Sequence, residues 1–197
     1  MDERYDLLFK GGVIVTGSGI QRADLAVRGE KVAAIAPDLH TEFAGRVIDA
    51  TGKYIFPGII DAHVHPVYTD DVEGSSRVAA YGGTTTLLHF AYARQGDSLV
   101  QKVSEMLEDA QKRSLLDFSL HGGIWEAAKQ VPEITAVMKL GVRTFKFFLT
   151  YLKQGWFTDD YQLSKAMDIL AQNGGMAMVH CENGGGIDYL EDKYLKG

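Results

Sequence analysis

Only one cysteine, Cys181, occurs among the 197 residues of the sequence. A single cysteine excludes an intramolecular disulfide framework and fits a reducing compartment, so we expect a cytoplasmic protein. No apolar run approaches the roughly 20 residues that a membrane-spanning helix needs. The N-terminal segment MDERYDLLFKGG also lacks the apolar core of a signal peptide. These absences predict a soluble protein without a membrane partner.

Basic residues never form a block, and the formal net charge is -6. The lack of a basic patch argues against a nucleic-acid partner. Proline is scarce, with 4 residues, whereas glycine is frequent, with 22, which is typical of short strands and tight loops. Hydrophobic residues make up 46% of the chain, enough for a sizeable core.

Short apolar runs separated by turns fill residues 1–54. Gly29 and Glu30 suit a tight hairpin turn, because glycine accepts a positive φ. No helix-length pattern occurs here, so we predict a β-sandwich-like unit. Its strands are expected at residues 5–10, 13–15, 23–28, 32–36 and 47–49.

Strands and helices alternate over residues 55–197. Pro132 and Gly141 bracket one helix, and Thr158 is expected to cap another, with Asp159 and Asp160 in its first turn. Alternation predicts parallel βα units, which fit either an open doubly wound sheet or a closed barrel. Because a (β/α)₈ TIM-type barrel takes about 250 residues, only about five of its units would fit. Strands are expected at 55–61, 84–90, 118–124, 144–150 and 176–180, and helices at 75–81, 98–113, 132–140, 158–172 and 187–196.

The segment Asp61-Ala62-His63-Val64-His65 is the sharpest chemical signal. In a regular strand, side chains alternate, so Asp61, His63 and His65 are expected on one face. Two imidazoles one pleat apart can bind one metal ion, at the strand end where barrel enzymes place their chemistry. The alternative is a pair of hydrogen-bonded structural histidines.

Four motifs occur in the order seen in the amidohydrolase superfamily. They are PGIIDAHVHP from Pro57, GGTTTLLHF from Gly82, TFKFFLTY from Thr144 and VHCENGG from Val179. Together they most resemble the hydantoinase/dihydropyrimidinase branch, and the resemblance covers essentially the whole chain as the N-terminal part of such a protein. It implies hydrolysis of a cyclic amide C–N bond in a hydantoin or dihydropyrimidine, and homo-oligomerisation.

The resemblance also implies a site for two divalent metal ions, expected to be zinc. His63, His65, Lys146 and His180 would be ligands, with Lys146 carboxylated to a bridging carbamate. Lys146 lies in an apolar strand, where a cation is costly, although it could also extend its amine to the barrel mouth. His180 could instead be structural.

Further residues near these motifs have expected roles. By the resemblance, Tyr151 would donate a hydrogen bond to the developing oxyanion, although it could be an ordinary aromatic residue at a strand end. Asp61 is expected to orient a metal ligand or to accept a structural hydrogen bond, and not to bind metal directly. Cys181 is expected to be buried, since it points away from His180. His89 and His121 are expected to form core hydrogen bonds. The pocket for the ring substituent would include the aromatic residues Tyr68, Tyr92, Trp156 and Phe157, which could equally serve loop packing.

Two family ligands, a histidine after the sixth strand and an aspartate after the eighth, match nothing in this sequence. We therefore expect a truncated chain or a barrel completed from elsewhere; alone, the chain would be an inactive fragment. A non-catalytic scaffold of the same fold is a second alternative, weakened by the presence of the four ligands. Allantoinase or dihydroorotase activity is a third, disfavoured by the spacing of Lys146 and Tyr151.

Overall fold

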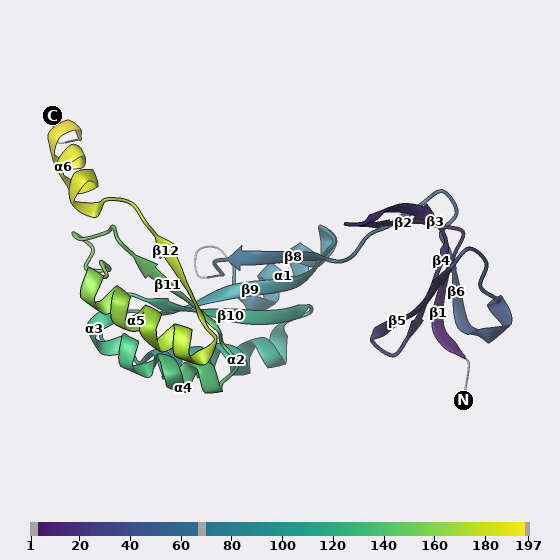
Figure 1. The fold of residues 1–197 in the computed structure, drawn as a ribbon, viewed down its shortest axis with the longest axis horizontal. Helices are drawn as coiled ribbons and strands as arrows, with labels where there is room; N and C mark the ends of the chain where they lie inside the picture. Colours follow the sequence, from purple (N-terminus) through teal and green to yellow (C-terminus); the bar gives the residue numbers. More distant parts are fainter. Residues whose placement is uncertain (1–3, 67–69, 196–197) are drawn as a thin grey trace. The chain divides into compact units, whose positions relative to one another are not determined.

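The computed structural model describes residues 4–66 and 70–195 and forms two compact units, Met1–Gly58 and Ile59–Gly197 (Figure 1). The expected domain boundary, after residue 54, lies just before the observed one. Tyr68, expected in the substrate pocket, lies outside the described residues.

The first unit contains two small sheets. One has the order β5-β4-β1-β6 and the other β3-β2-β7. A 3₁₀ turn, Thr41–Phe43, precedes β6. The expected strands of this unit are all present, but β3 and β7 were not predicted. All four residues of β3 are exposed, and β7 has only two residues, so neither carries an apolar pattern. The strands are β1 Tyr5–Lys10, β2 Val13–Thr16, β3 Gly19–Arg22, β4 Asp24–Arg28, β5 Lys31–Ala36, β6 Ala44–Asp49 and β7 Tyr54–Ile55.

The second unit contains one five-stranded sheet with the order β12-β11-β10-β9-β8. Every pair in it is parallel, so the prediction of an α/β fold built from parallel βα units is confirmed. The sequential strand order is that of a sheet able to continue into a barrel. The strands are β8 Ile59–Val64, β9 Thr84–Ala93, β10 Asp117–Ile124, β11 Thr144–Phe148 and β12 Met176–His180.

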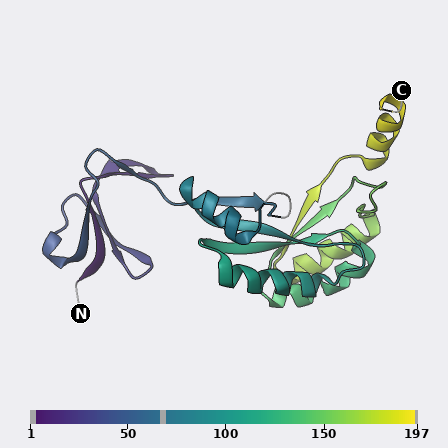
Figure 2. The ribbon, with the colours of Figure 1, turned by 180° about the vertical axis from the view of Figure 1, so that it is seen from behind.

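Helices pack against one face of this sheet, except the last helix, which extends away from the sheet beyond β12 (Figures 1 and 2). The buried cluster between them includes Leu99 and Val103 from α2, Phe145 and Phe147 from β11, and Leu170 from α5. Alternate strand residues supply this core, which leaves the intervening ones on the opposite face. The helices are α1 Val72–Tyr81, α2 Leu99–Arg113, α3 Ala127–Gln130, α4 Ile134–Lys139, α5 Asp160–Asn173 and α6 Gly184–Tyr194, with a 3₁₀ turn at Val131–Glu133.

Several expected element ends differ from the structure. Helix α1 begins at Val72 rather than at residue 75, the helix expected at 132–140 is divided into a 3₁₀ turn and α4, and β11 ends at Phe148 rather than at residue 150. Asp159, not Thr158, caps α5, and its side chain accepts a hydrogen bond from the Gln162 amide. Helix α6 begins at Gly184 rather than Ile187, because Asn183 caps it and its three glycines join the first turn. The strand expected from residue 55 begins at Ile59. Residues 54–55 instead pair with β2 in the first unit.

Candidate functional site

Strand β8 carries an irregularity close to His63 and His65. Three steps along β8, from Asp61 to Val64, match only two steps along β9, from Leu87 to His89. One extra residue in a strand reverses the alternation of the residues that follow it. The Asp61 carboxylate accepts a hydrogen bond from the His63 amide at 3.1 Å. The expectation that Asp61 shares a face with both histidines is therefore wrong, and Asp61 contacts the backbone of the bulge.

His63 of β8 and His65, which directly follows the strand, lie against an aromatic cluster on the face of the sheet opposite the helices. The ring centroids of His63 and His65 are 4.9 Å apart, and each lies 4.6 Å from that of Phe90. His65 Nδ1 forms a hydrogen bond of 3.1 Å with the Tyr92 hydroxyl. Burial, followed by the nearby charge of His63, lowers the pKa of His65. A lowered pKa favours the neutral imidazole, which is the form that binds metals.

His121 connects three strands beneath this pair. From β10 it forms hydrogen bonds with the Ala62 carbonyl of β8, at 2.9 Å, and with the Thr144 hydroxyl of β11. These contacts confirm the expected core hydrogen bonding and support the irregular part of β8.

His89 does not follow the same expectation. It is fully buried, and neither ring nitrogen has a hydrogen-bond partner among the residues that the structure describes. Burial lowers its pKa, against an opposing influence of the Asp61 charge. Since its neighbours Leu87 and Ala91 on the same face are also buried, apolar surroundings leave the neutral ring without a partner.

Strand β11 places Lys146 between two core residues. Phe145 and Phe147 point into the helix-covered core, so Lys146 points to the opposite face, where it is 9% exposed. Burial lowers the pKa of Lys146. Its Nζ lies 5.5 Å from the centroid of the Phe148 ring. The sequence pattern alone indicates this alternation, and the structure explains why the cation stays on the open face.

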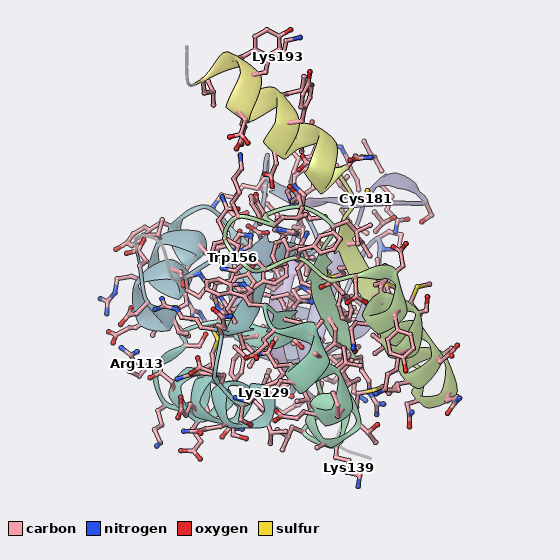
Figure 3. The ribbon with its side chains drawn as sticks, turned by 90° about the vertical axis from the view of Figure 1, so that its left-hand side faces the viewer. Arg113, Lys129, Lys139, Trp156, Cys181 and Lys193 are labelled. Carbon is pink, nitrogen blue, oxygen red and sulfur yellow. The ribbon has the colours of Figure 1, made fainter. Side chains whose placement is uncertain are left out.

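The end of β12 carries His180 beside the same face. His180 Nε2 lies 2.9 Å from a carboxylate oxygen of Glu182. Cys181 is exposed, so the expectation of a buried cysteine is wrong. It lies between the end of β12 and the start of α6 (Figure 3).

Tyr151 follows β11 in a strained conformation. Its φ of 63° is left-handed, which costs a residue other than glycine about 1–3 kcal/mol. The ring centroid of Tyr151 lies 5.3 Å from that of Trp156 and 5.5 Å from that of His180. Strain of this size persists only where surrounding contacts hold it, and it is common at functional sites.

A cavity of about 240 Å³ collects these side chains at the carboxyl ends of the strands. It includes all four expected metal ligands, the expected catalytic tyrosine and two of the expected pocket aromatics. Asp61 and Phe157 do not line it. The lining residues are His63, His65, Tyr92, Trp125, Lys146, Phe148, Tyr151, Trp156 and His180.

Trp125 lines the cavity but was not predicted. Its ring stacks on that of Trp156 at 4.2 Å. The buried side chain of Gln130 fixes this corner: its Oε1 accepts from the amide of Trp125 at 3.0 Å, and its Nε2 donates to the carbonyl of Ala93 at 3.1 Å. Only the position of Trp125 just after a strand signalled a role, and aromatic residues are common there.

Gly123 of β10 makes room for the Tyr92 ring in the same cavity. A Cβ at position 123 would lie 2.1 Å from a carbon of that ring, closer than any real contact. Because Gly123 and Tyr92 pair directly in register, a side chain here would displace Tyr92 and the hydrogen bond it makes with His65.

Metal binding would require several of the expected ligands, or of the other side chains that could bind a metal, to lie close together. Within residues 4–66 and 70–195, no three His, Cys, Asp or Glu side chains lie close enough together to hold a metal ion. The imidazoles of His63, His65 and His180 thus do not form such a group with one another or with a described carboxylate or thiol. Lys146 borders the same cavity, and a neutral lysine amine can become an anionic ligand by adding CO₂.

The helices among residues 4–66 and 70–195 include none with the length and apolar character that a membrane span requires.

Known proteins resemble the chain over nearly its whole length. It is 36% identical over 198 residues to a D-hydantoinase of Rhizobium radiobacter, with 96% of this chain and 43% of that protein covered. It is 33% identical to a dihydropyrimidinase of Rattus norvegicus, covering 90% and 37%. It is 35% identical to an allantoinase of Desulfitobacterium hafniense, covering 91% and 41%. No protein-family model matches the chain.

Solved structures agree with the sequence matches. A dihydropyrimidinase from Brevibacillus agri superposes with a TM-score of 0.86 at 33% identity, over 96% of this chain and 42% of that one. The chain thus spans about two fifths of the length of the relatives that it matches.

Proposed function

Since the chain belongs to the hydantoinase/dihydropyrimidinase branch of the amidohydrolase superfamily, we propose that the whole protein hydrolyses the C–N bond of a small cyclic amide. The substrate would be a hydantoin or a dihydropyrimidine. One observation carries the proposal: His63, His65, Lys146 and His180 line a single cavity at the carboxyl ends of parallel strands. That edge of a barrel is where enzymes of this architecture bind substrate.

The residues of the cavity fit a pair of divalent metal ions, which we propose to be zinc. Imidazole nitrogen is a ligand that zinc prefers. Burial lowers the pKa of Lys146, and only a neutral amine can attack CO₂ to form a carbamate. Carbamate formation replaces a buried cation with an anion, which two dications would stabilise. When bound, such ions would supply a nucleophilic hydroxide at neutral pH, because coordination lowers the pKa of water.

Other residues of the cavity have separate proposed roles. Tyr151, beside His180, would donate its hydroxyl hydrogen to the oxyanion that develops on the ring carbonyl. Tyr92 would orient His65 through their hydrogen bond. Asp61 would fix the bulge that presents His63 through its hydrogen bond to the His63 amide. Trp156 and Tyr92 would line the pocket for the ring substituent, together with Trp125.

The remaining parts of the catalytic site are proposed to come from further βα units that close a (β/α)₈ barrel. They would supply another histidine ligand and an aspartate that moves the proton from the nucleophile to the leaving nitrogen. The sequential order of the five parallel strands supports this closure. We further propose that the protein is a cytoplasmic homo-oligomer, as its single cysteine and its family suggest.

Allantoin hydrolysis is the main alternative, since the allantoinase of Desulfitobacterium hafniense is 35% identical. Dihydroorotase activity and a non-catalytic scaffold role are further alternatives. The presence of Lys146 with the three histidines favours an enzyme over a scaffold.

A substrate panel tests the proposal on the whole protein loaded with divalent metal. Dihydrouracil and a 5-aryl hydantoin should be hydrolysed, whereas allantoin and dihydroorotate should not. The reverse pattern would assign the site to an allantoinase or dihydroorotase. Full metal content without turnover of any of the four would favour the scaffold role.

A further inference from the structure

Gly184, the first residue of α6, packs directly against the loop that follows β11. It is buried, and its amide donates a hydrogen bond to the Leu149 carbonyl at 3.0 Å. A Cβ at this position would lie 2.3 Å from Leu152 Cδ1, 2.7 Å from the Leu149 carbonyl oxygen and 2.9 Å from Thr150 Cα. Two of these three atoms belong to the backbone, so a side chain here would push the loop away.

The same loop holds Tyr151 in its left-handed conformation. The Leu149 amide donates to the carbonyl of His180 at 2.9 Å, and the Trp156 amide donates to the carbonyl of Tyr151 at 3.2 Å. The hydrogen bonds of Leu149 therefore join the loop to both the end of β12 and the start of α6. Tyr151, two residues further on, takes its φ of 63° between these anchors.

A second link joins the loop to the outer turns of α6. Lys153 Nζ lies 3.0 Å from Asp192 Oδ1 and donates to the Asp188 carbonyl at 3.2 Å. This link is on the surface, with the Lys153 side chain 41% exposed. Both links hold the same loop on α6, and the one at Gly184 requires a residue without a Cβ.

We propose that Gly184 is a positioning residue for Tyr151. The missing side chain lets the loop dock on α6, and the docked loop aims the tyrosine into the cavity beside His180. This inference rests on the proposed function, because Tyr151 matters to turnover only if it donates to the oxyanion. A displacement of about 1 Å in such a group can lower a rate about 100-fold.

The chain offers a matched control in the next residue. A Cβ at Gly185 would have only one neighbour within 4 Å, Asn183 Oδ1, at 3.8 Å. Gly184→Ala and Gly185→Ala make the same chemical change in the same helical turn, so they alter helix propensity alike. A difference in kcat between the two variants therefore measures the effect of the contact between position 184 and the loop.

The experiment compares both variants with the wild type in the whole, metal-loaded protein, with dihydrouracil as substrate. Gly184→Ala should lower kcat about 10-fold to 100-fold with little change in KM or metal content, because it disturbs a group used in the transition state. Gly185→Ala should retain the wild-type kcat. Equal effects of the two variants would overturn the inference.

A double-mutant cycle with Tyr151→Phe separates positioning of Tyr151 from a general structural effect. Once the hydroxyl is gone, Gly184→Ala should have almost no further effect on kcat, because both changes remove one interaction. If Gly184→Ala lowers kcat by the same factor in both backgrounds, Gly184 acts elsewhere and the inference is wrong.

Two outcomes need separate readouts. If Gly184→Ala does not fold, Lys153→Ala replaces it in the cycle, since it loosens the same loop from the surface; an unchanged kcat would then overturn the inference. If the wild type hydrolyses no cyclic amide, the proposed function fails. The role of Gly184 can then still be tested by near-ultraviolet circular dichroism, because the contact between the Tyr151 and Trp156 rings contributes to that signal. The signal should change in Gly184→Ala and stay unchanged in Gly185→Ala.

Discussion

A charged side chain is buried in each of the two units, and their surroundings differ. Asp24 in the first unit is 2% exposed, and it accepts hydrogen bonds from Lys10 Nζ at 2.8 Å and from the amides of Gly11 and Leu39 at 2.7 and 2.9 Å. Lys146 in the second unit is 9% exposed, and no carboxylate of the described residues forms an ion pair with it.

The pKa values of the two groups reflect this difference. Burial raises the pKa of Asp24, but the bonds from Lys10 and the two amides outweigh it and hold the pKa below its ordinary value. Burial lowers the pKa of Lys146 and outweighs an opposing influence of the nearby Cys181. Asp24 is stabilised as an anion, whereas Lys146 is destabilised as a cation. A buried charge with its partners indicates a structural role, and one without them indicates a functional site.

Lys146→Met should have the largest effect. Turnover should fall to background, because methionine cannot form a carbamate. The metal-free protein should become more stable at neutral pH, since the cost of the buried cation disappears. That cost applies below the lowered pKa and fades as the pH rises towards the ordinary value of 10.5. Chemical denaturation with a chelator, together with an activity assay, measures both effects.

The control for this variant is Lys139→Met, on the exposed surface of α4. It should change neither turnover nor stability appreciably. A Lys146→Met protein with wild-type turnover would remove Lys146 from the catalytic site.

Tyr151→Phe should lower kcat about 100-fold to 1,000-fold, the usual loss when one oxyanion donor is removed. KM should change little, because the hydrogen bond strengthens only in the transition state. Steady-state kinetics with dihydrouracil as substrate measures kcat and KM separately. Tyr161→Phe, at a 73% exposed position on α5, is the matched change outside the cavity. Equal kcat values for the two variants would contradict the role of Tyr151.

Asp24→Asn should destabilise the protein by about 1–3 kcal/mol, the range for leaving buried hydrogen-bonding groups without a partner. Asp38→Asn is a close control, because Asp38 also bonds to Lys10 but is 86% exposed. It should change stability by less than about 0.5 kcal/mol. Urea denaturation of the two variants compares them. Similar losses would mean that the ion pair, and not burial, determines the contribution of Asp24.

The smallest expected effect is the pH dependence of the contribution that Asp24 makes to stability. Because the folded pKa of Asp24 is lowered, its stabilisation is present above the ordinary value of 3.8 and is lost as the pH falls through the folded value. The stability difference between wild type and Asp24→Asn should therefore shrink below pH 3.8. Denaturation curves measured at several acidic pH values would show this, and a constant difference would contradict the pKa assignment.

Much of the candidate site follows from the sequence because it depends on regular periodicity. Alternation in β11 places Lys146 opposite Phe145 and Phe147, and the strand ends bring His65 and His180 to one edge. These positions depend on local patterns, which are readable in one chain segment at a time.

The features of the candidate site that the sequence did not predict depend on contacts between distant segments of the chain. The bulge in β8 reverses the alternation between Asp61 and the histidines, and nothing in a strand pattern marks the extra residue. Trp125 is held at the cavity because Gln130 of α3 bonds both to its amide and to the carbonyl of Ala93 in β9, 37 residues earlier. The importance of Gly184 depends on a loop that precedes it by more than 30 residues. Such features appear only once the chain is folded.

The most direct test of the account is to detect the carbamate on Lys146. The whole protein would be incubated with divalent metal and bicarbonate labelled with the NMR-active carbon isotope, and its carbon spectrum compared with that of Lys146→Met. We predict a carbamate signal in the wild type that disappears in the variant together with the bound metal. A metal-loaded, active wild type without this signal would contradict the assignment of Lys146 as a metal ligand.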